Sequence, residues 1–126
     1  MIYLASPYTH EYPEITQMRY DFTLEITAYL IKNGYIIFSP IVHCHVIAIK
    51  YNLPKTYKFW RDYSQAGIVA CDSLMIAAID GWKLSSGVQD EYDFAASLGK
   101  KISMITPLLL GGYEIIDSVP KNPFKE

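Results

Sequence analysis

The strongest constraint on the fold is a regular alternation of short apolar runs with longer amphipathic stretches. The short runs lie at residues 2–5, 35–39, 73–78 and 101–105. Strands that alternate with helices in this way form a parallel sheet whose faces the helices cover. The pattern therefore predicts an α/β protein with a flavodoxin-like or Rossmann-like sheet of four to five parallel strands and helices on both faces. A chain of 126 residues fits a single domain, residues 1–126.

Three stretches between these runs have helical spacing. The first begins near Pro13 and places six apolar residues on one face: Ile15, Met18, Phe22, Ile26, Tyr29 and Leu30. The second covers residues 56–71 and the third covers residues 87–98. Residues 41–52 are compatible with either a loop or a short helix. The tail, residues 106–126, could supply a last short strand or an arm at a subunit interface.

Polar side chains gather at one edge of the predicted sheet. Ligands of open α/β sheets bind beyond the carboxyl ends of the strands. The polar residues at or near that edge are Ser6, Tyr8, Ser39, His43, Asp80, Ser85, Ser86 and Thr106. An active site is expected among these residues and their neighbours.

Glu91 interrupts an apolar stripe on the third helix. Val88, Ala95 and Leu98 lie at helical spacing around it and are expected to face the core. A buried carboxylate is costly unless it is paired or hydrogen-bonded, so Glu91 is a candidate for chemistry. The positive end of its helix is expected to favour the ionised form, which suits a nucleophile or a stabiliser of an oxocarbenium-like sugar. The alternative is a structural carboxylate bonded to backbone or to a tyrosine hydroxyl.

The loop Ser85-Ser86-Gly87 leads into the same helix. Its backbone N–H groups and two hydroxyls could hold a phosphate, although serine and glycine also form ordinary helix caps. Ser6, after the first apolar run, has the same two interpretations. No G-x-G-x-x-G fingerprint follows that run, which disfavours a dinucleotide site. A flavin carrier is disfavoured because the first loop lacks a hydroxyl-rich phosphate cradle.

The segment His43-Cys44-His45 combines two metal-ligating residue types. It lacks the companion carboxylate or cysteine spacing of a metal site, so no metal is expected. His43 is expected to face a ligand or to be a satisfied structural histidine.

Two aromatic residues could stack on a base. Trp82 lies in the loop after the third apolar run and is the better candidate, whereas Trp60 belongs to a helical stripe and is expected in the core. Asp62 and Ser64 flank that stripe at comparable angles. Periodicity alone does not decide which of these two points into the site.

Composition and charge exclude several classes of protein. The formal net charge of −2 gives no electrostatic footprint for a nucleic acid polymer. Cys44 and Cys71 form no C-x-x-C pair, so neither a disulfide framework nor a zinc site is expected. The chain begins directly with an apolar strand and has no run long enough to span a membrane. We therefore expect a soluble, cytoplasmic protein without a cofactor.

The motifs at residues 2–8 (IYLASPY) and 38–41 (FSPI) are similar to those of small proteins in the nucleoside 2-deoxyribosyltransferase superfamily, near the 2′-deoxynucleoside 5′-phosphate N-hydrolases. The resemblance covers residues 2 to about 105. In that superfamily, a glutamate four residues after a loop glycine attacks the anomeric carbon, and Glu91 has this spacing from Gly87. The resemblance implies that Tyr3 lies near the glutamate and that Ser85, with Ser6, contacts a 5′-phosphate.

One position departs from the pattern of that superfamily. Relatives carry an aspartate where this chain has Ser64, eight residues before Asp72, and Asp62 is the nearest substitute for assisting the leaving base. The resemblance implies an N-glycosidase that acts on a small-molecule (deoxy)nucleoside 5′-monophosphate, with hydrolysis expected over base transfer. It also implies a homodimer or larger homo-oligomer. A nucleotide-binding or sensing module with impaired catalysis is the alternative that Ser64 motivates.

Overall fold

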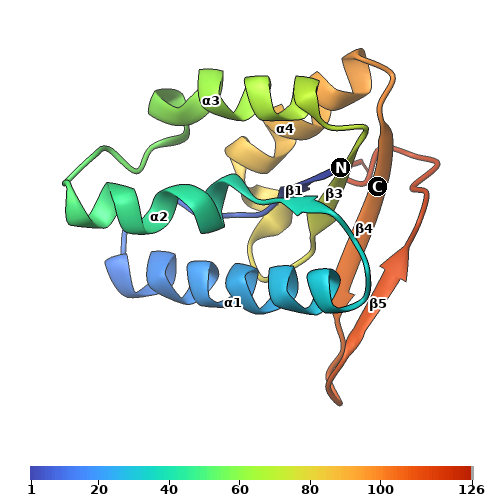
Figure 1. Cartoon of the computed structure of the whole chain (residues 1–126), viewed down its shortest axis with the longest axis horizontal. Helices are drawn as coiled ribbons and strands as arrows, with labels where there is room; N and C mark the ends of the chain where they lie inside the picture. The colour runs from blue at the N-terminus through green and yellow to red at the C-terminus, as the bar shows by residue number, and fades with distance from the viewer. Residues whose placement is uncertain (126) are drawn as a thin grey trace.

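Five strands form one sheet in the computed structural model, which describes residues 1–125 (Figure 1). The strands are β1 (Ile2–Ala5), β2 (Ile37–Phe38), β3 (Ser73–Ala77), β4 (Lys101–Pro107) and β5 (Tyr113–Ile116). Their order across the sheet is β2-β1-β3-β4-β5. The first four are parallel to one another, as predicted.

The last strand corrects the prediction of a purely parallel sheet. β5 pairs with β4 in the antiparallel direction, with Ile105 opposite Ile115. Only residues 108–112 join the two strands, and a parallel pair would need a crossover of a dozen or more residues. Gly111 and Gly112 both have positive φ, which lets the chain reverse within this short connection.

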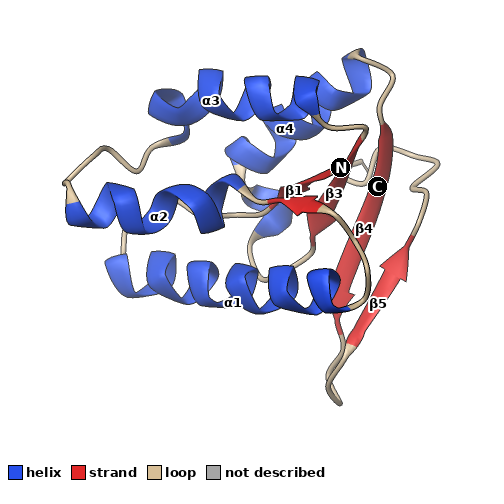
Figure 2. Cartoon of the chain, in the orientation of Figure 1, coloured by secondary structure: helices blue, strands red, loops and turns tan. Residues whose placement is uncertain are grey.

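Four α-helices cover the sheet (Figure 2). They are α1 (Pro13–Lys32), α2 (Pro40–Lys50), α3 (Tyr57–Ala70) and α4 (Ser86–Ser97), and a short 3-10 helix, η1 (Trp82–Leu84), precedes α4. Most of residues 41–52, which the sequence allowed to be either a loop or a short helix, therefore form helix α2. Ser39 caps α2 because its Oγ accepts a hydrogen bond from the Val42 N–H, and Pro40 suits the first helical position.

Alternate strand residues face two separate core clusters. Tyr3 and Ala5 pack with residues of α3 and α4, whereas Leu4 packs with Ile26 and Leu30 of α1 on the opposite face. α3 and α4 lie side by side, and α2 lies beside α1 (Figure 1). The prediction of helices on both faces is confirmed. No helix within the described residues is long and apolar enough to cross a membrane.

The buried face of α1 differs from the predicted one. Met18 and Phe22 are exposed by 49% and 45%, although the apolar spacing placed them in the core. Ile26 and Leu30 are buried as predicted, and the helix also buries Thr16, Thr23 and Thr27. The Thr23 and Thr27 hydroxyls donate to the carbonyl oxygens of the residues four positions earlier, at 2.8 and 2.7 Å. These bonds remove the cost of burying a hydroxyl, so threonine replaces an apolar residue here.

Candidate active site

A cavity of about 790 Å³ opens where the sheet order changes direction. Its walls come from the loops after β1, α2 and β3, from α2, from the first two turns of α3 and α4, and from Arg19 of α1. This is the position at which open α/β sheets bind ligands. The volume is in the range of small-molecule sites.

Glu91 lies at the inner wall of this cavity and is buried, with 5% of its surface exposed. Val88 and Ala95 are buried beside it on α4, as the stripe predicted. Leu98 is not: it is 46% exposed, because Gly99 at φ +72° ends the helix and Leu98 is already the C-cap. Tyr3, fully buried on β1, donates its hydroxyl proton to Glu91 Oε2.

Burial controls the protonation of Glu91. It raises the pKa of this carboxyl to about 8, and the neighbouring Asp90 carboxylate adds to the rise, while hydrogen bonds with Tyr3 and Ser64 oppose it. Glu91 lies in the second turn of α4, beyond the first turn where the helix dipole acts. Desolvation therefore outweighs the dipole, and the free protein holds Glu91 largely protonated at neutral pH. The pKa of Tyr3 is also raised by burial and by Glu91, so Tyr3 remains a donor.

A second set of contacts joins α3 to α4 beside Glu91. Tyr57 donates to Asp90 Oδ2 at 3.0 Å, and Arg61 Nε lies 3.4 Å from the same oxygen. The Tyr57 ring packs on Gly87, where an added Cβ would lie 3.0 Å from the ring carbon Cδ1. Gly87 is thus required for the close approach of Tyr57. These contacts were not predicted from the sequence, although Tyr57 and Arg61 lie one helical turn apart.

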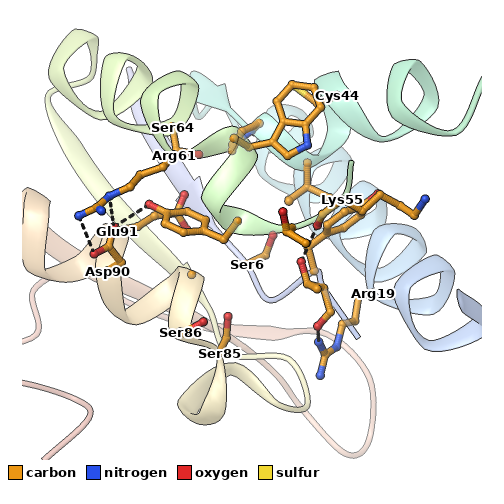
Figure 3. Close-up of a pocket in the computed structure, with 18 of the residues that line it drawn as sticks. Ser6, Arg19, Cys44, Lys55, Arg61, Ser64, Ser85, Ser86, Asp90 and Glu91 are labelled. Atoms are coloured by element: carbon orange, nitrogen blue, oxygen red, sulfur yellow. Dashed lines mark hydrogen bonds and ion pairs between the residues drawn. The ribbon is translucent and has the colours of Figure 1, made fainter. Parts of the chain in front are cut away.

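Hydroxyl donors face the cavity at the end of β1 and at the start of α4. Ser6 Oγ is buried and has no hydrogen-bond partner among the described residues. Ser85 is the N-cap of α4, where its Oγ accepts from the Val88 N–H at 3.2 Å and retains its own proton to donate. Ser86 also lines the cavity. In Figure 3, Ser6 lies between Glu91 on one side and Arg19 on the other.

Several cations line the cavity, in a chain of net charge −2. The cations that line the cavity are Arg19, Lys55, Lys58 and Arg61, against the carboxylates of Asp90 and Glu91. Arg19 Nη1 donates to the Thr9 carbonyl at 2.7 Å, which fixes its guanidinium beside Gly81. A side chain at Gly81 would collide with that guanidinium. An anion is the ligand that these groups suit best.

The structure separates two neighbours that periodicity could not. Ser64 is buried and lines the cavity beside Glu91, whereas Asp62 is exposed and lies outside the lining. Two positions along a helix correspond to about 200° of rotation, so only one of the pair can face inward. Asp62 is therefore not brought together with the other predicted site residues.

The same separation occurs for the histidines of α2. His45 is buried and lines the cavity. His43 is exposed outside the lining, with its ring stacked on Tyr63 at a centroid distance of 6.1 Å. Among the described residues, no three His, Cys, Asp or Glu side chains are placed to hold a metal ion.

The two tryptophans exchange their expected positions. Trp60 lines the cavity and donates its indole N–H to the Pro54 carbonyl at 2.6 Å. Trp82 lies on η1 outside this cavity and packs edge-on against Phe124 at 5.4 Å. Phe124 belongs to the tail, far from Trp82 in the sequence. The position of Trp82 in a loop therefore gave no indication that its ring is in contact with another side chain.

The family of the chain follows from comparison with known sequences. Residues 1–106 match the family described as Domain of unknown function (DUF1937). The chain belongs to this family. The DUF1937 match extends from β1 into β4, so it includes every residue of the cavity lining, whereas β5 lies beyond it. Among curated proteins, none matches the chain.

Proposed function

We propose that the protein is an N-glycosidase that cleaves the bond between base and sugar in a (deoxy)nucleoside 5′-monophosphate. The observation that carries this proposal is the pairing of a buried, hydrogen-bonded carboxyl, Glu91, with a wall of free donors and cations in one cavity. A carboxylate suits attack on an anomeric carbon, and the donor wall suits a phosphate. The superfamily resemblance of the sequence supports the same assignment.

In this proposal Glu91 is the nucleophile. The ionised fraction of Glu91, which grows as pH approaches its pKa of about 8, attacks C1′ of the sugar. The C1′–N bond breaks, and the base leaves with the bonding electrons and takes a proton from solvent. Water then attacks C1′ of the glycosyl ester, which places a hydroxyl on C1′, returns a proton to solvent, releases the sugar 5-phosphate and restores the carboxylate. Tyr3 holds the attacking carboxyl through its hydrogen bond. Hydrolysis is preferred over base transfer, in which a second base would replace water.

The proposed phosphate contacts come from the end of β1, the start of α4 and Arg19. Ser6, Ser85 and Ser86 donate hydroxyls, the N–H groups at Ser86 and Gly87 add the end of the helix, and Arg19 supplies charge. Ser6 is the most informative of these residues. A buried hydroxyl without a partner is costly, and a phosphate oxygen would relieve that cost.

A second candidate function is a nucleotide-binding or sensing module with impaired turnover. Ser64 faces Glu91 at the position where the resemblance predicts an aspartate, and Asp62 is exposed. A missing acid would slow departure of the base by roughly a hundredfold to ten-thousandfold. Binding of monophosphates without release of base from any of them would favour this module over the glycosidase.

Assembly into a homodimer or larger homo-oligomer is also a proposal. The turn between β4 and β5 exposes Leu109 and Leu110 completely. Burial of such residues between copies would be favourable. Light scattering after gel filtration would test this, and a monomer at micromolar concentration would contradict it.

The central test is an assay for free base with a panel of ribo- and deoxynucleoside 5′-monophosphates. We expect release by the native protein and at least a thousandfold slower release by Glu91→Gln, the loss typical of removing a nucleophile. Asp93→Asn is the matched control, because Asp93 is an exposed carboxylate two residues along the same helix. Equal release by native protein and Glu91→Gln would refute the assignment.

A further inference from the structure

A chain of four side chains runs from the surface of α1 to the cavity. Gln17 Nε2 donates to Asp21 Oδ1 at 3.0 Å, and Gln17 Oε1 lies 3.1 Å from His45 Nε2. His45 Nδ1 lies 2.6 Å from the Tyr8 hydroxyl. The His45 ring is also stacked on Tyr20 at a centroid distance of 4.0 Å. His45 and Tyr8 both line the cavity.

The order of these contacts fixes the direction of every hydrogen bond. Asp21 accepts only, so the Gln17 amide must turn its NH₂ group toward Asp21 and its oxygen toward His45. That oxygen requires a proton on His45 Nε2. In neutral imidazole the other nitrogen, Nδ1, is then bare and accepts the proton of Tyr8.

The ionisation of the two cavity residues agrees with this direction. Burial lowers the pKa of His45, which favours the neutral ring, although Asp21 opposes the shift. Burial raises the pKa of Tyr8 to about 12, so the hydroxyl keeps its proton. Because the Tyr8 hydroxyl donates its proton to His45 Nδ1, its oxygen can act only as a hydrogen-bond acceptor toward a ligand in the cavity.

We propose that Tyr8 determines base specificity by accepting a hydrogen bond from an exocyclic amino group of the base. The inference rests on the proposed function and names its substrate class: adenine or cytosine nucleotides over their 6-oxo and 4-oxo counterparts. An oxo group at that position would meet the Tyr8 lone pairs without a proton between them. The cavity side chains of Ile41, Trp60 and Tyr63 supply an apolar, aromatic environment for the base.

Binding to matched pairs of nucleotides tests the proposal. Calorimetry in a Glu91→Gln background, which prevents turnover, would compare the 5′-monophosphates of deoxyadenosine with deoxyinosine and of deoxycytidine with deoxyuridine. We expect the amino member to bind about ten- to a hundredfold more tightly in at least one pair, because its counterpart leaves an acceptor unpaired. Tyr8→Phe should reduce that ratio to near one. Tyr20→Phe, which keeps the ring stacked on His45, should preserve it.

The outcomes separate this inference from the function on which it rests. Equal binding within both pairs, or a preference that survives Tyr8→Phe, would overturn the inference and leave the glycosidase standing. No binding of any of the four nucleotides would remove both. A measurement without ligand adds a further test, because ¹⁵N NMR of His45 should show the proton on Nε2. A proton on Nδ1 would overturn the inference regardless of the nucleotide-binding results.

Discussion

Two buried serine hydroxyls in the same cavity have opposite surroundings. Ser64, on α3, lines the cavity beside Glu91 and lowers the pKa of that carboxyl, which accepts a hydrogen bond from Tyr3. Ser6, at the end of β1, is equally buried, but its hydroxyl has no partner among residues 1–125. Glu91 therefore has a buried hydrogen-bond donor beside it in the free protein, whereas Ser6 has no partner within the described residues.

The difference separates preorganisation from ligand binding. Around Glu91 the protein supplies the donors that orient the carboxyl, so no ligand is needed to fix its position. Around Ser6 the protein supplies donors and the Arg19 charge but no acceptor. A buried group without a partner costs about 1–3 kcal/mol, which an anionic ligand would recover on binding.

The largest expected effect is a pH-dependent loss of stability at Glu91. The pKa of Glu91 is raised from 4.5 to about 8, so between these values the folded protein holds a proton that the unfolded chain has released. Folding stability must therefore fall as pH rises from about 4.5 to about 8 and become constant, for this group, above that pH. The total loss is on the order of a few kcal/mol.

Thermal unfolding of native protein and Glu91→Gln across this range would measure the effect. The Tm of Glu91→Gln should not fall with pH as the Tm of the native protein does. The Tm of the variant relative to native protein should therefore rise from pH 5 and be highest above pH 8. Parallel curves for the two proteins would mean that the Glu91 carboxyl is not protonated in the native state.

The next effect contrasts the two serines. Ser6→Ala removes an unpartnered hydroxyl and should stabilise the free protein by about 1 kcal/mol, yet weaken monophosphate binding about tenfold. Ser64→Ala removes a hydroxyl that lowers the pKa of Glu91, so the pKa of Glu91 should rise further while the free protein gains no stability. Unfolding in urea and calorimetric titration would measure both variants. Destabilisation by Ser6→Ala would show that its hydroxyl already has a partner.

The smallest effect concerns the contact between Gly87 and Tyr57. In Gly87→Ala the new Cβ displaces the Tyr57 ring by a few tenths of an ångström, while alanine favours the helix by about 1 kcal/mol. Stability should change by less than about 1 kcal/mol, and base release should fall a few-fold. Gln89→Ala, at an exposed position of the same helix, should leave base release unchanged. Unchanged release by Gly87→Ala would show that the close contact between Gly87 and Tyr57 does not influence cleavage.

The sequence was sufficient to predict elements whose burial follows apolar spacing. The alternation of strands and helices, the parallel direction of the first four strands, and the burial of Val88, Glu91 and Ala95 all follow from local pattern. The prediction was right for Ile26 and Leu30 of α1 but wrong for Met18 and Phe22, because threonines satisfy their hydroxyls on the preceding turn and then behave as core residues. It was wrong for β5 because the direction of the last strand depends on a five-residue turn.

The remaining site residues depend on contacts between distant segments. Arg19 reaches the cavity because α1 lies beside the loop that contains Gly81, and Trp82 is occupied by Phe124 of the tail. Neither contact can be predicted from the residues next to it in the sequence. Asp62 and Ser64 illustrate the same limit, since helical spacing gave two inward candidates and only packing against Glu91 distinguishes them.

The central claim, that Glu91 forms a glycosyl ester, is tested most directly by stereochemistry at the anomeric carbon. Methanol would compete with water as acceptor during cleavage of a β-configured deoxynucleoside 5′-monophosphate, and proton NMR would identify the methyl glycoside. Two successive displacements at C1′ retain the configuration. The account predicts the β-methyl product from native protein and none from Glu91→Gln. The α-methyl product would contradict attack by Glu91 and would indicate direct attack by the acceptor.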